Sequence, residues 1–555
     1  MDASPRSHNL LARLLLKHWT VRPNTKSPQE VEREKYLFLY VKGIPFNRWI
    51  LFPSAFLIQF CCGSLYSWSN FNKPIDTLVY GSATANRAVN AFYIAVGMFG
   101  FTTFILGPWL ERHGPRKGLL LGSIAFGLGN AITAISLKET SIVGVYIGYG
   151  VLCGFGLGLN YISPVSALQK YFPDHRGVAA GFAVAGFGAG STVWSKCYLP
   201  LIDAYKLPWT FGILAFVQTA GMLIGAIAMR TPPVDFTVKG LTVRGDMVVD
   251  ADGFKVIEDD VEKNAPAPGV KPGANVQIGL VESMFSPDFF FMYLMFFANQ
   301  LFGLVVLSRL SSMAQDLFSQ SETEGSNVVS INGVFNFLGR LSLPLIGDFA
   351  IRTTRVNPPY TRKVTFFFTL ITQISILAAL RHVIHTRNYD AFRGLIWTIT
   401  FVYGGGFGTI PCFLTDMFGP YNIGALHGLI LTAWSIAGVG GGLGFTHVYN
   451  THKPGPLAAG QTKYSPGAFD KAYISNFDWI HIVMACGVLM IFLVRTDYVD
   501  RTSPGWRFSI FGRKIIHLFP NAKSNYSAQA VRDSQSTDQS PAYENGLGKV
   551  SEITE

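Results

Sequence analysis

The chain has 555 residues, of which 49% are hydrophobic, 14% are aromatic and only 14% are charged, and its formal net charge is +11. Together with a positive mean hydropathy, this composition excludes an ordinary soluble enzyme and indicates a polytopic membrane protein. The positive charge does not indicate nucleic-acid binding, because the lysines and arginines lie in short segments between apolar runs and no aromatic-basic module is present.

Apolar windows long enough to cross a bilayer, about 17–25 residues each, occur along most of the chain. Twelve such windows begin near Trp49, Asn90, Gly118, Ile142, Val178, Trp209, Phe289, Val328, Val364, Phe392, Ile423 and Trp479. They are split six and six by a polar, acidic stretch that contains proline and glycine and cannot span a membrane. We therefore expect an all-α membrane protein with twelve transmembrane helices in two six-helix bundles.

This pattern divides the chain into five parts. We expect a cytoplasmic N-terminal segment (1–48), a first bundle (49–230), a cytoplasmic linker (231–285), a second bundle (286–495) and a cytoplasmic, largely disordered tail (496–555). The tail is polar and rich in serine and glutamine at its end, a composition typical of disorder.

Basic residues predict which side of the membrane each loop faces. If the N-terminus is cytoplasmic, the basic residues of the short loops fall in segments that are also cytoplasmic, as the positive-inside rule requires. They are Arg48, Arg112, Arg116, Lys117, Lys170, Arg176, Arg352, Arg355, Arg362 and Lys363. Both termini are therefore expected in the cytoplasm. We expect the plasma membrane, with an organellar membrane as the alternative.

A weak internal repeat supports a duplicated architecture. RGVAAG (176–181) follows the fourth span, and IGALHG (423–428) follows the tenth. Each comes after a turn with phenylalanine and proline and opens a glycine-rich helix. The glycines of each copy are four residues apart, a spacing that lets two helices approach closely.

Acidic residues stand in equivalent loops of the two halves. GPWLERHGPRK (107–117) contains Glu111 before Arg112 and Arg116, and PLIGDFAIRTTR (344–355) contains Asp348. An acid at a helix end that faces arginines can form a charge lock that holds one state of a rocking carrier. The positive-inside rule explains the arginines but not the acids, so we predict gating roles for these four residues.

Arg340 stands near the middle of an apolar run, FNFLGRLSLPLIGD (335–348). A guanidinium keeps its charge there and costs about 2.5–3.5 kcal/mol on insertion scales, so it usually faces a partner or a watery cavity. Asn332 and Asn336 precede it at four-residue spacing, which places all three on one helical face. The twelve apolar cores contain no Asp or Glu, which leaves backbone carbonyls, aromatic rings or a bound anion as partners. We favour the anion and predict a substrate site.

Other spans supply possible walls for this site. Tyr66 lies on an approximate polar face of the first span, and Tyr161 belongs to a glycine-rich stretch of the fourth span. Catalysis finds no support: His427 and His481 each stand without an acid and a nucleophile nearby in the sequence. The six cysteines show neither metal-ligand spacing nor a disulfide framework. We therefore predict no enzyme activity, no metal and no cofactor.

Four stretches together resemble the oxalate/formate antiporter family of the major facilitator superfamily, which is related to the monocarboxylate transporters. They are NRWILFPSAFLIQFCCGSLYSWSNFNKP, YISPVSALQKYFPDHRGVAAGFAVAGFGAGS, FNFLGR and YGGGFGTIPCFLTDMFGPYNIGALHGLILTAWSIAGVGG. The loop containing Glu111 is also close to that superfamily's G-x-x-x-D-R-x-G-R-R/K motif, with glutamate in place of aspartate. The resemblance implies two six-helix bundles, alternating access and a central site for small organic carboxylates.

The resemblance also implies roles for single residues. Arg340 matches the arginine that pairs with substrate, and Tyr66 and Tyr161 match wall positions. Phe187 stands where the oxalate-transporting member has a tyrosine, and Trp434 stands where it has a second cationic residue, a lysine. The substrate-binding set is then Arg340, Asn336, Asn332, Tyr66, Tyr161, Phe187 and Trp434.

We therefore predict a secondary active or facilitative transporter of small organic anions, with monocarboxylates as the first expectation. It would work in the lipid bilayer as a monomer, with an exchanged anion or a proton as the coupled species. Two alternatives remain open: a facilitator-type carrier of another solute, such as a sugar or a drug-like molecule, and a membrane receptor that binds substrate without transporting it.

Overall fold

The computed structural model describes residues 17–19, 26–38, 43–83, 85–233, 236–243, 280–420, 422–455, 464–497, 500–501, 505–510 and 513–519. Most of the expected N-terminal segment and linker, and the end of the tail with its predicted disorder, lie outside these residues. The described residues of the linker and tail include helix α10 (Leu280–Met284) and two antiparallel hairpins. The hairpins are β1 (Thr237–Val238) with β2 (Leu241–Thr242), and β3 (Trp506–Ile510) with β4 (Arg513–Leu518).

Long apolar helices make up the body of the protein. In the first half they are η1 (Arg48–Ile50) continued by α3 (Leu51–Cys62) and η2 (Gly63–Asn70), α5 (Val89–His113), α6 (Pro115–Lys138), α7 (Ile142–Val145) continued by η3 (Tyr146–Cys153) and α8 (Gly154–Tyr171), and α9 (Arg176–Ala226). In the second half they are α11 (Pro287–Phe318), α12 (Glu322–Thr354), α13 (Pro358–His385), α14 (Tyr389–Phe418), α15 (Ile423–His452) and α16 (Asp470–Leu493). Short helices are α2 (Pro28–Glu34), α4 (Asn72–Tyr80) and α10 (Leu280–Met284).

The described part of the chain contains eleven helices long and apolar enough to cross a membrane. One of them, α9, has 51 residues and is broken at Lys206, whose φ of 66° and ψ of 164° are not helical. Since 51 residues are about twice the length one crossing needs, α9 contains both the fifth and the sixth predicted spans. The expected all-α fold with twelve crossings is therefore confirmed.

Local sequence signals explain where these helices start and stop. Ser286 and Ser321 cap α11 and α12 by accepting backbone N–H groups three residues on. Gly114 and Gly419 end α5 and α14 with φ angles of 81° and 85°, a region that favours glycine. Tight turns between consecutive spans follow from these residues.

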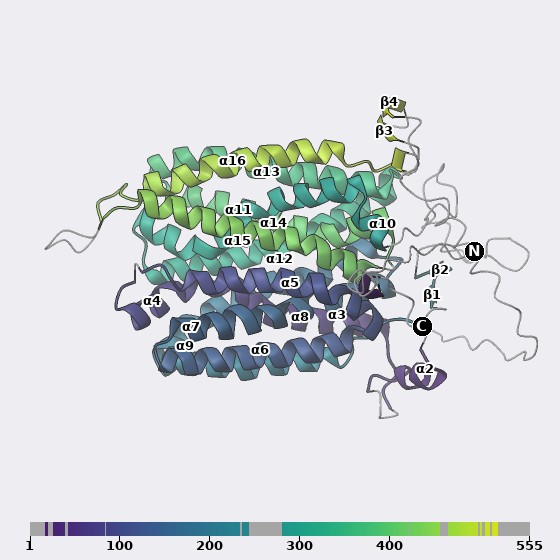
Figure 1. The fold of residues 1–555 in the computed structure, drawn as a ribbon, viewed down its shortest axis with the longest axis horizontal. Helices are drawn as coiled ribbons and strands as arrows, with labels where there is room; N and C mark the ends of the chain where they lie inside the picture. The colour runs from purple at the N-terminus through teal and green to yellow at the C-terminus, as the bar shows by residue number, and fades with distance from the viewer. Residues whose placement is uncertain are drawn as a thin grey trace, which may run out of the picture.

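The two halves form two layers that meet along α5, α9, α12 and α15 (Figure 1). In this contact α9 packs along α12, and α15 packs along α5. Each of these helix pairs therefore joins one half of the chain to the other.

The helix ends near α2, α10 and both hairpins are called the proximal end of the protein, and the helix ends near α4 are called the distal end (Figure 1).

The glycines of the internal repeat lie in the contact between the two halves. A Cβ on Gly181 would come within 2.9 Å of the Arg340 carbonyl oxygen, and one on Gly428 within 2.2 Å of the Thr103 carbonyl oxygen. Real side chains do not fit at such distances, so glycine is what allows the helices to touch. The close approach predicted from the repeat is confirmed in both copies.

Candidate functional site

Arg340 lies at the centre of the contact between the two halves and is 0% exposed. Its Nε donates to Asn336 Oδ1 (2.8 Å), its Nη2 donates to the Tyr66 hydroxyl (3.0 Å), and its Nη1 donates to the Tyr161 hydroxyl (3.4 Å) and the Val184 carbonyl (3.2 Å). All of these acceptors are neutral. Among the described residues, no carboxylate forms an ion pair with this guanidinium.

Aromatic rings surround the same guanidinium. Its carbon lies 4.4 Å from the ring centroid of Phe407, 5.2 Å from that of Phe187 and 5.6 Å from that of Tyr66. A desolvated guanidinium over aromatic faces gains about 2 kcal/mol or more. These rings therefore help to hold a charge in an apolar interior.

A chain of hydrogen bonds continues from Tyr66 into the second half. The Tyr66 and Tyr403 hydroxyls lie 2.9 Å apart, and Trp434 Nε1 donates to the Tyr403 hydroxyl (3.0 Å). The Trp434 ring also packs edge-on against Phe99 and Phe407. The structure thus brings six of the seven sequence-predicted binding residues into one buried cluster: Arg340, Asn336, Tyr66, Tyr161, Phe187 and Trp434.

The seventh, Asn332, lies one turn before Asn336 on α12 and is 1% exposed. Neither its amide nitrogen nor its amide oxygen has a hydrogen-bond partner, and the amide nitrogen of Asn336 also lacks one. Buried polar atoms normally find partners. The polar stripe on α12 therefore ends in amide groups with unused hydrogen-bonding capacity.

Sequence reasoning missed Tyr403 and Phe407, although both stand in the quoted stretch YGGGFGTIP. Their spacing of four residues places them on one face of α14. The glycines between them allow close contact: a Cβ on Gly404 would lie 2.4 Å from the Asn336 carbonyl oxygen, so only glycine lets α14 approach α12 here.

Glu111 lies in the last turn of α5, at the proximal end of the interface, and is 7% exposed. Its carboxylate accepts the Gly424 N–H (2.7 Å) at the start of α15 and the Ser166 hydroxyl (3.1 Å), and it forms an ion pair with Lys170 of α8. A carboxylate at a helix N-terminus is stabilised by the free N–H groups there. Glu111 thus joins the first half of the chain to the second.

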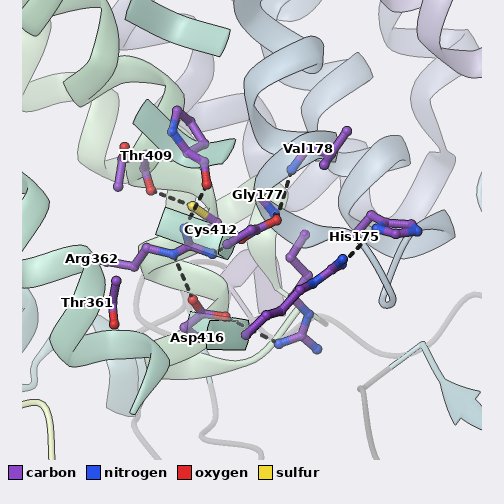
Figure 2. Close-up of polar contacts among 12 residues, drawn as sticks. His175, Gly177, Val178, Thr361, Arg362, Thr409, Cys412 and Asp416 are labelled. Atoms are coloured by element: carbon purple, nitrogen blue, oxygen red, sulfur yellow. Dashed lines mark hydrogen bonds and ion pairs between the residues drawn. The ribbon is translucent and has the colours of Figure 1, made fainter. Parts of the chain in front are cut away.

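Asp348 occupies the corresponding place in the second half. Its carboxylate accepts the N–H groups of Gly177 (2.9 Å) and Val178 (3.3 Å) at the start of α9, and it pairs with Arg362 of α13. Figure 2 shows Arg362 between this helix start and Asp416. The two acids therefore bind the two copies of the internal repeat in the same manner, each across the interface.

The cations of these contacts differ from those the sequence suggested. Lys170 and Arg362, considered only as loop charges, are the partners of the two acids. Arg112 donates to the carbonyls of residues 17 and 18 (3.1 and 3.0 Å), and Arg116 donates to the Ile227 carbonyl (2.8 Å). The gating roles of Arg112 and Arg116 remain predictions, and the structure places Arg112 against the N-terminal segment and Arg116 against the C-terminal end of α9.

Asp416 in the last turn of α14 was also missed. It pairs with Arg362 (3.2 Å) and with Arg176 (3.6 Å), so it links α13 to the start of α9 (Figure 2). The signal was present in the sequence, because TDMF places an acid just inside the end of an apolar span. An acid at the margin of an apolar span usually has a charged partner.

His175, just before α9, adds a contact that depends on pH. Arg352 of α12 donates to the Nδ1 atom of His175 (2.9 Å; Figure 2). Burial lowers the pKa of His175, which keeps the ring a neutral acceptor. Protonation removes this acceptor, so the contact is lost as the pH falls through the lowered pKa.

The distal end of the interface is bonded as well. Ser326 donates to the Ser195 carbonyl (2.9 Å), Ser330 donates to the Thr192 carbonyl (2.8 Å), and Lys73 donates to Gln315 Oε1 (2.7 Å). Each of these contacts joins one half of the chain to the other. The buried centre around Arg340 is therefore closed at both ends in this structure.

Comparison with known proteins identifies the family. Residues 55–442 match the Major Facilitator Superfamily. The chain belongs to this family. Its fold agrees, since it resembles the crystal structure of a bacterial homologue of the iron transporter ferroportin in an outward-facing state, with a TM-score of 0.51, 14% identity, and coverage of 80% of this chain and 98% of that one.

Several known transporters are 22–24% identical to this chain over the residues that align. The uncharacterized MFS-type transporter YhjX of Escherichia coli (strain K12) is 24% identical over 71% of this chain and 86% of its own length. The oxalate:formate antiporter of Oxalobacter formigenes is 23% identical over 72% and 85%. The apicoplast pyruvate carrier 1 of Toxoplasma gondii is 22% identical over 57% and 61%. The chain is therefore a multi-pass membrane transporter of this superfamily.

Proposed function

We propose that this transporter carries small organic anions, and monocarboxylates in particular, by alternating access between its two bundles. The observation that carries the proposal is the state of Arg340. A permanently charged guanidinium lies fully buried at the interface and has only neutral acceptors around it. A carboxylate bound there would gain a charge-assisted, bidentate hydrogen bond, the strongest contact a guanidinium can make.

The surroundings of Arg340 suit an anion of one charge. The ring walls of Phe187, Phe407 and Trp434 are apolar, and the free amide groups of Asn332 and Asn336 offer neutral donors and acceptors. One fixed cation neutralises one carboxylate, and a second carboxylate would face aromatic wall. A buried charge without a partner costs several kcal/mol.

The named relatives support this substrate class. One is an oxalate:formate antiporter and another a pyruvate carrier, and all three of these anions are small carboxylates. The resemblance aligns Trp434 of this chain with a lysine of the oxalate carrier, so this chain lacks that second cation. Pyruvate and lactate are therefore proposed ahead of oxalate.

The proximal contacts of Glu111 and Asp348 are proposed as the gate. Each acid ties the start of a helix in the other half, so opening this end requires both contacts to break. We further propose that the proximal end faces the cytoplasm, because the basic loop residues gather there, and that the protein lies in the plasma membrane.

Uptake by purified protein in proteoliposomes tests the proposal. Labelled pyruvate, lactate, formate, oxalate and glucose are offered in parallel, and binding is measured on the same preparation by thermal shift. Saturable uptake of a monocarboxylate supports the proposal. Uptake of glucose alone would identify a carrier of another solute, and binding without flux would identify a receptor.

A further inference from the structure

His427 lies on α15, on the second repeat segment, and is 0% exposed. Neither ring nitrogen has a hydrogen-bond partner. Buried donors and acceptors are paired in most proteins, and leaving one unpaired destabilises the folded state. An imidazole with two unused nitrogens in this position therefore needs a functional reason.

The ring lies between the gate and the central site. It stacks on Tyr161, with ring centroids 6.0 Å apart and planes 10° from parallel, and the Tyr161 hydroxyl accepts from Arg340. One turn nearer the proximal end, Gly424 donates its N–H to Glu111. His427 and Gly424 share a helix face because they are three residues apart. The histidine is thus one contact away from both the predicted anion site and the predicted gate.

Nearby ionisable groups already have partners. Glu111 of α5 pairs with Lys170 of α8, Tyr161 of α8 binds Arg340, and Arg340 of α12 is bonded on all three nitrogens. On α11 and α14, the tyrosines that reach α15 bond to other residues: Tyr293 to Thr432 and Tyr403 to Trp434. Glu282 stands on α10, which also packs on α15.

We propose that His427 binds and releases the proton that travels with the anion. This inference rests on the proposed function, because it names the coupled ion of the same carrier. Imidazole is the side chain that changes charge near neutral pH. The ring takes a proton from water when the centre opens to one side, and it becomes an imidazolium while a monocarboxylate binds Arg340. On the other side the carboxylate leaves and the ring returns its proton to water.

This cycle has a defined charge balance. One proton and one monoanion cross together, so the transported charge is zero. No bond other than N–H forms or breaks, and no further reactant is needed. A pH gradient, and not a membrane voltage, should then drive accumulation.

The experiment compares two transport modes in proteoliposomes. The first is accumulation of labelled pyruvate driven by an imposed inward pH gradient with the voltage clamped, and the second is exchange of labelled for unlabelled pyruvate at equal pH. Protein-free vesicles correct for diffusion of the undissociated acid. His427→Gln is compared with wild type and with His481→Gln, which changes a half-buried histidine on α16.

We expect wild type and His481→Gln to accumulate pyruvate at least about tenfold in a gradient of two pH units, whose limit for one coupled proton is about a hundredfold. His427→Gln should accumulate none above equilibration, yet exchange at a rate within about threefold of wild type. A merely structural histidine would reduce both modes together. Accumulation by His427→Gln that equals wild type would overturn the proposal.

A second measurement uses wild type alone, so that a poorly folded variant does not decide the question. A pH-sensitive dye inside the vesicles reports whether protons enter with pyruvate. Acidification in proportion to pyruvate uptake supports the proposal. Pyruvate uptake without acidification overturns the role of His427 and leaves the proposed substrate class intact, whereas the absence of any pyruvate uptake overturns both.

Discussion

Arg340 on α12 donates to the Tyr66 hydroxyl on η2 at 3.0 Å, so the buried cation of the second bundle is held by a residue of the first. Tyr66 in turn bonds Tyr403 across the interface at 2.9 Å. A carboxylate that binds Arg340 must compete with this neutral hydroxyl. Since a carboxylate adds the attraction of opposite charges and can accept two parallel N–H groups from the guanidinium, the anion is expected to win, and its binding would loosen one contact between the bundles.

Replacing Arg340 with glutamine should abolish carboxylate uptake while the protein still reaches the membrane. Lysine should restore only part of it, because an ammonium lacks the planar fork that matches a carboxylate. Proteoliposome uptake measures both variants. Arg381→Gln is the matched control, since this arginine is about half exposed in an ion pair with Asp478. Near-normal uptake by Arg340→Gln would return Arg340 to a structural role.

The unmodified protein should prefer pyruvate to oxalate by at least about tenfold at neutral pH, which corresponds to about 1.4 kcal/mol. Trp434→Lys should shift this preference towards dicarboxylates, because it supplies a second cation in place of an aromatic wall. Competition at equal concentrations measures the ratio. Equal uptake of the two anions by wild type would show that a second positive group reaches the site.

Neutralising Glu111 or Asp348 should favour the state that is open at the proximal end. Glu111→Gln and Asp348→Asn each weaken a contact between an acid and a helix start in the other half, and the ion pairs with Lys170 and Arg362 are lost as well. Labelling of single cysteines from each side of the membrane reports the balance. Unchanged labelling in both variants would contradict the gate assignment.

Gly424→Ala should disturb the same gate without changing any charge. A Cβ at this position would lie 2.4 Å from Glu111 Oε1, whereas one on Gly440 of the same helix would meet nothing within 4 Å. Gly440→Ala is therefore a control with an identical substitution on α15. We expect the labelling pattern of Gly424→Ala to follow that of Glu111→Gln. A Gly424→Ala pattern equal to that of Gly440→Ala would show that the Glu111 contact is dispensable.

Asp288→Asn should lower stability and leave substrate preference unchanged. Asp288 at the start of α11 pairs with Arg495 just after α16 at 2.8 Å, and both side chains are 0% exposed. Breaking a buried pair by removing one partner costs about 3–5 kcal/mol. Thermal unfolding in detergent measures the loss, and Asp390→Asn, a change at a largely exposed acid, should shift the midpoint little. An equal unfolding midpoint for the two variants would contradict the expected contribution of the Asp288–Arg495 pair to stability.

The sequence by itself determined the number of crossings, the division into two bundles and the position of Arg340. These features depend on local composition, because about twenty apolar residues suffice for one helix to cross a bilayer. A charged residue within such a run can be identified from the sequence without knowing which group it pairs with. The repeat glycines were predictable for the same reason, since their spacing alone places them on one helix face.

Only the tertiary structure decided which groups meet. Glu111 binds Gly424, 313 positions away, and its cation is Lys170, not a neighbouring arginine of its own loop. Tyr403 and Phe407 enter the central cluster because α14 packs on α12 through glycine. His427 has no hydrogen-bond partner because of how α15 packs on its neighbours. Partners across a helix interface depend on the packing and rotation of whole helices, and no short stretch of sequence contains that information.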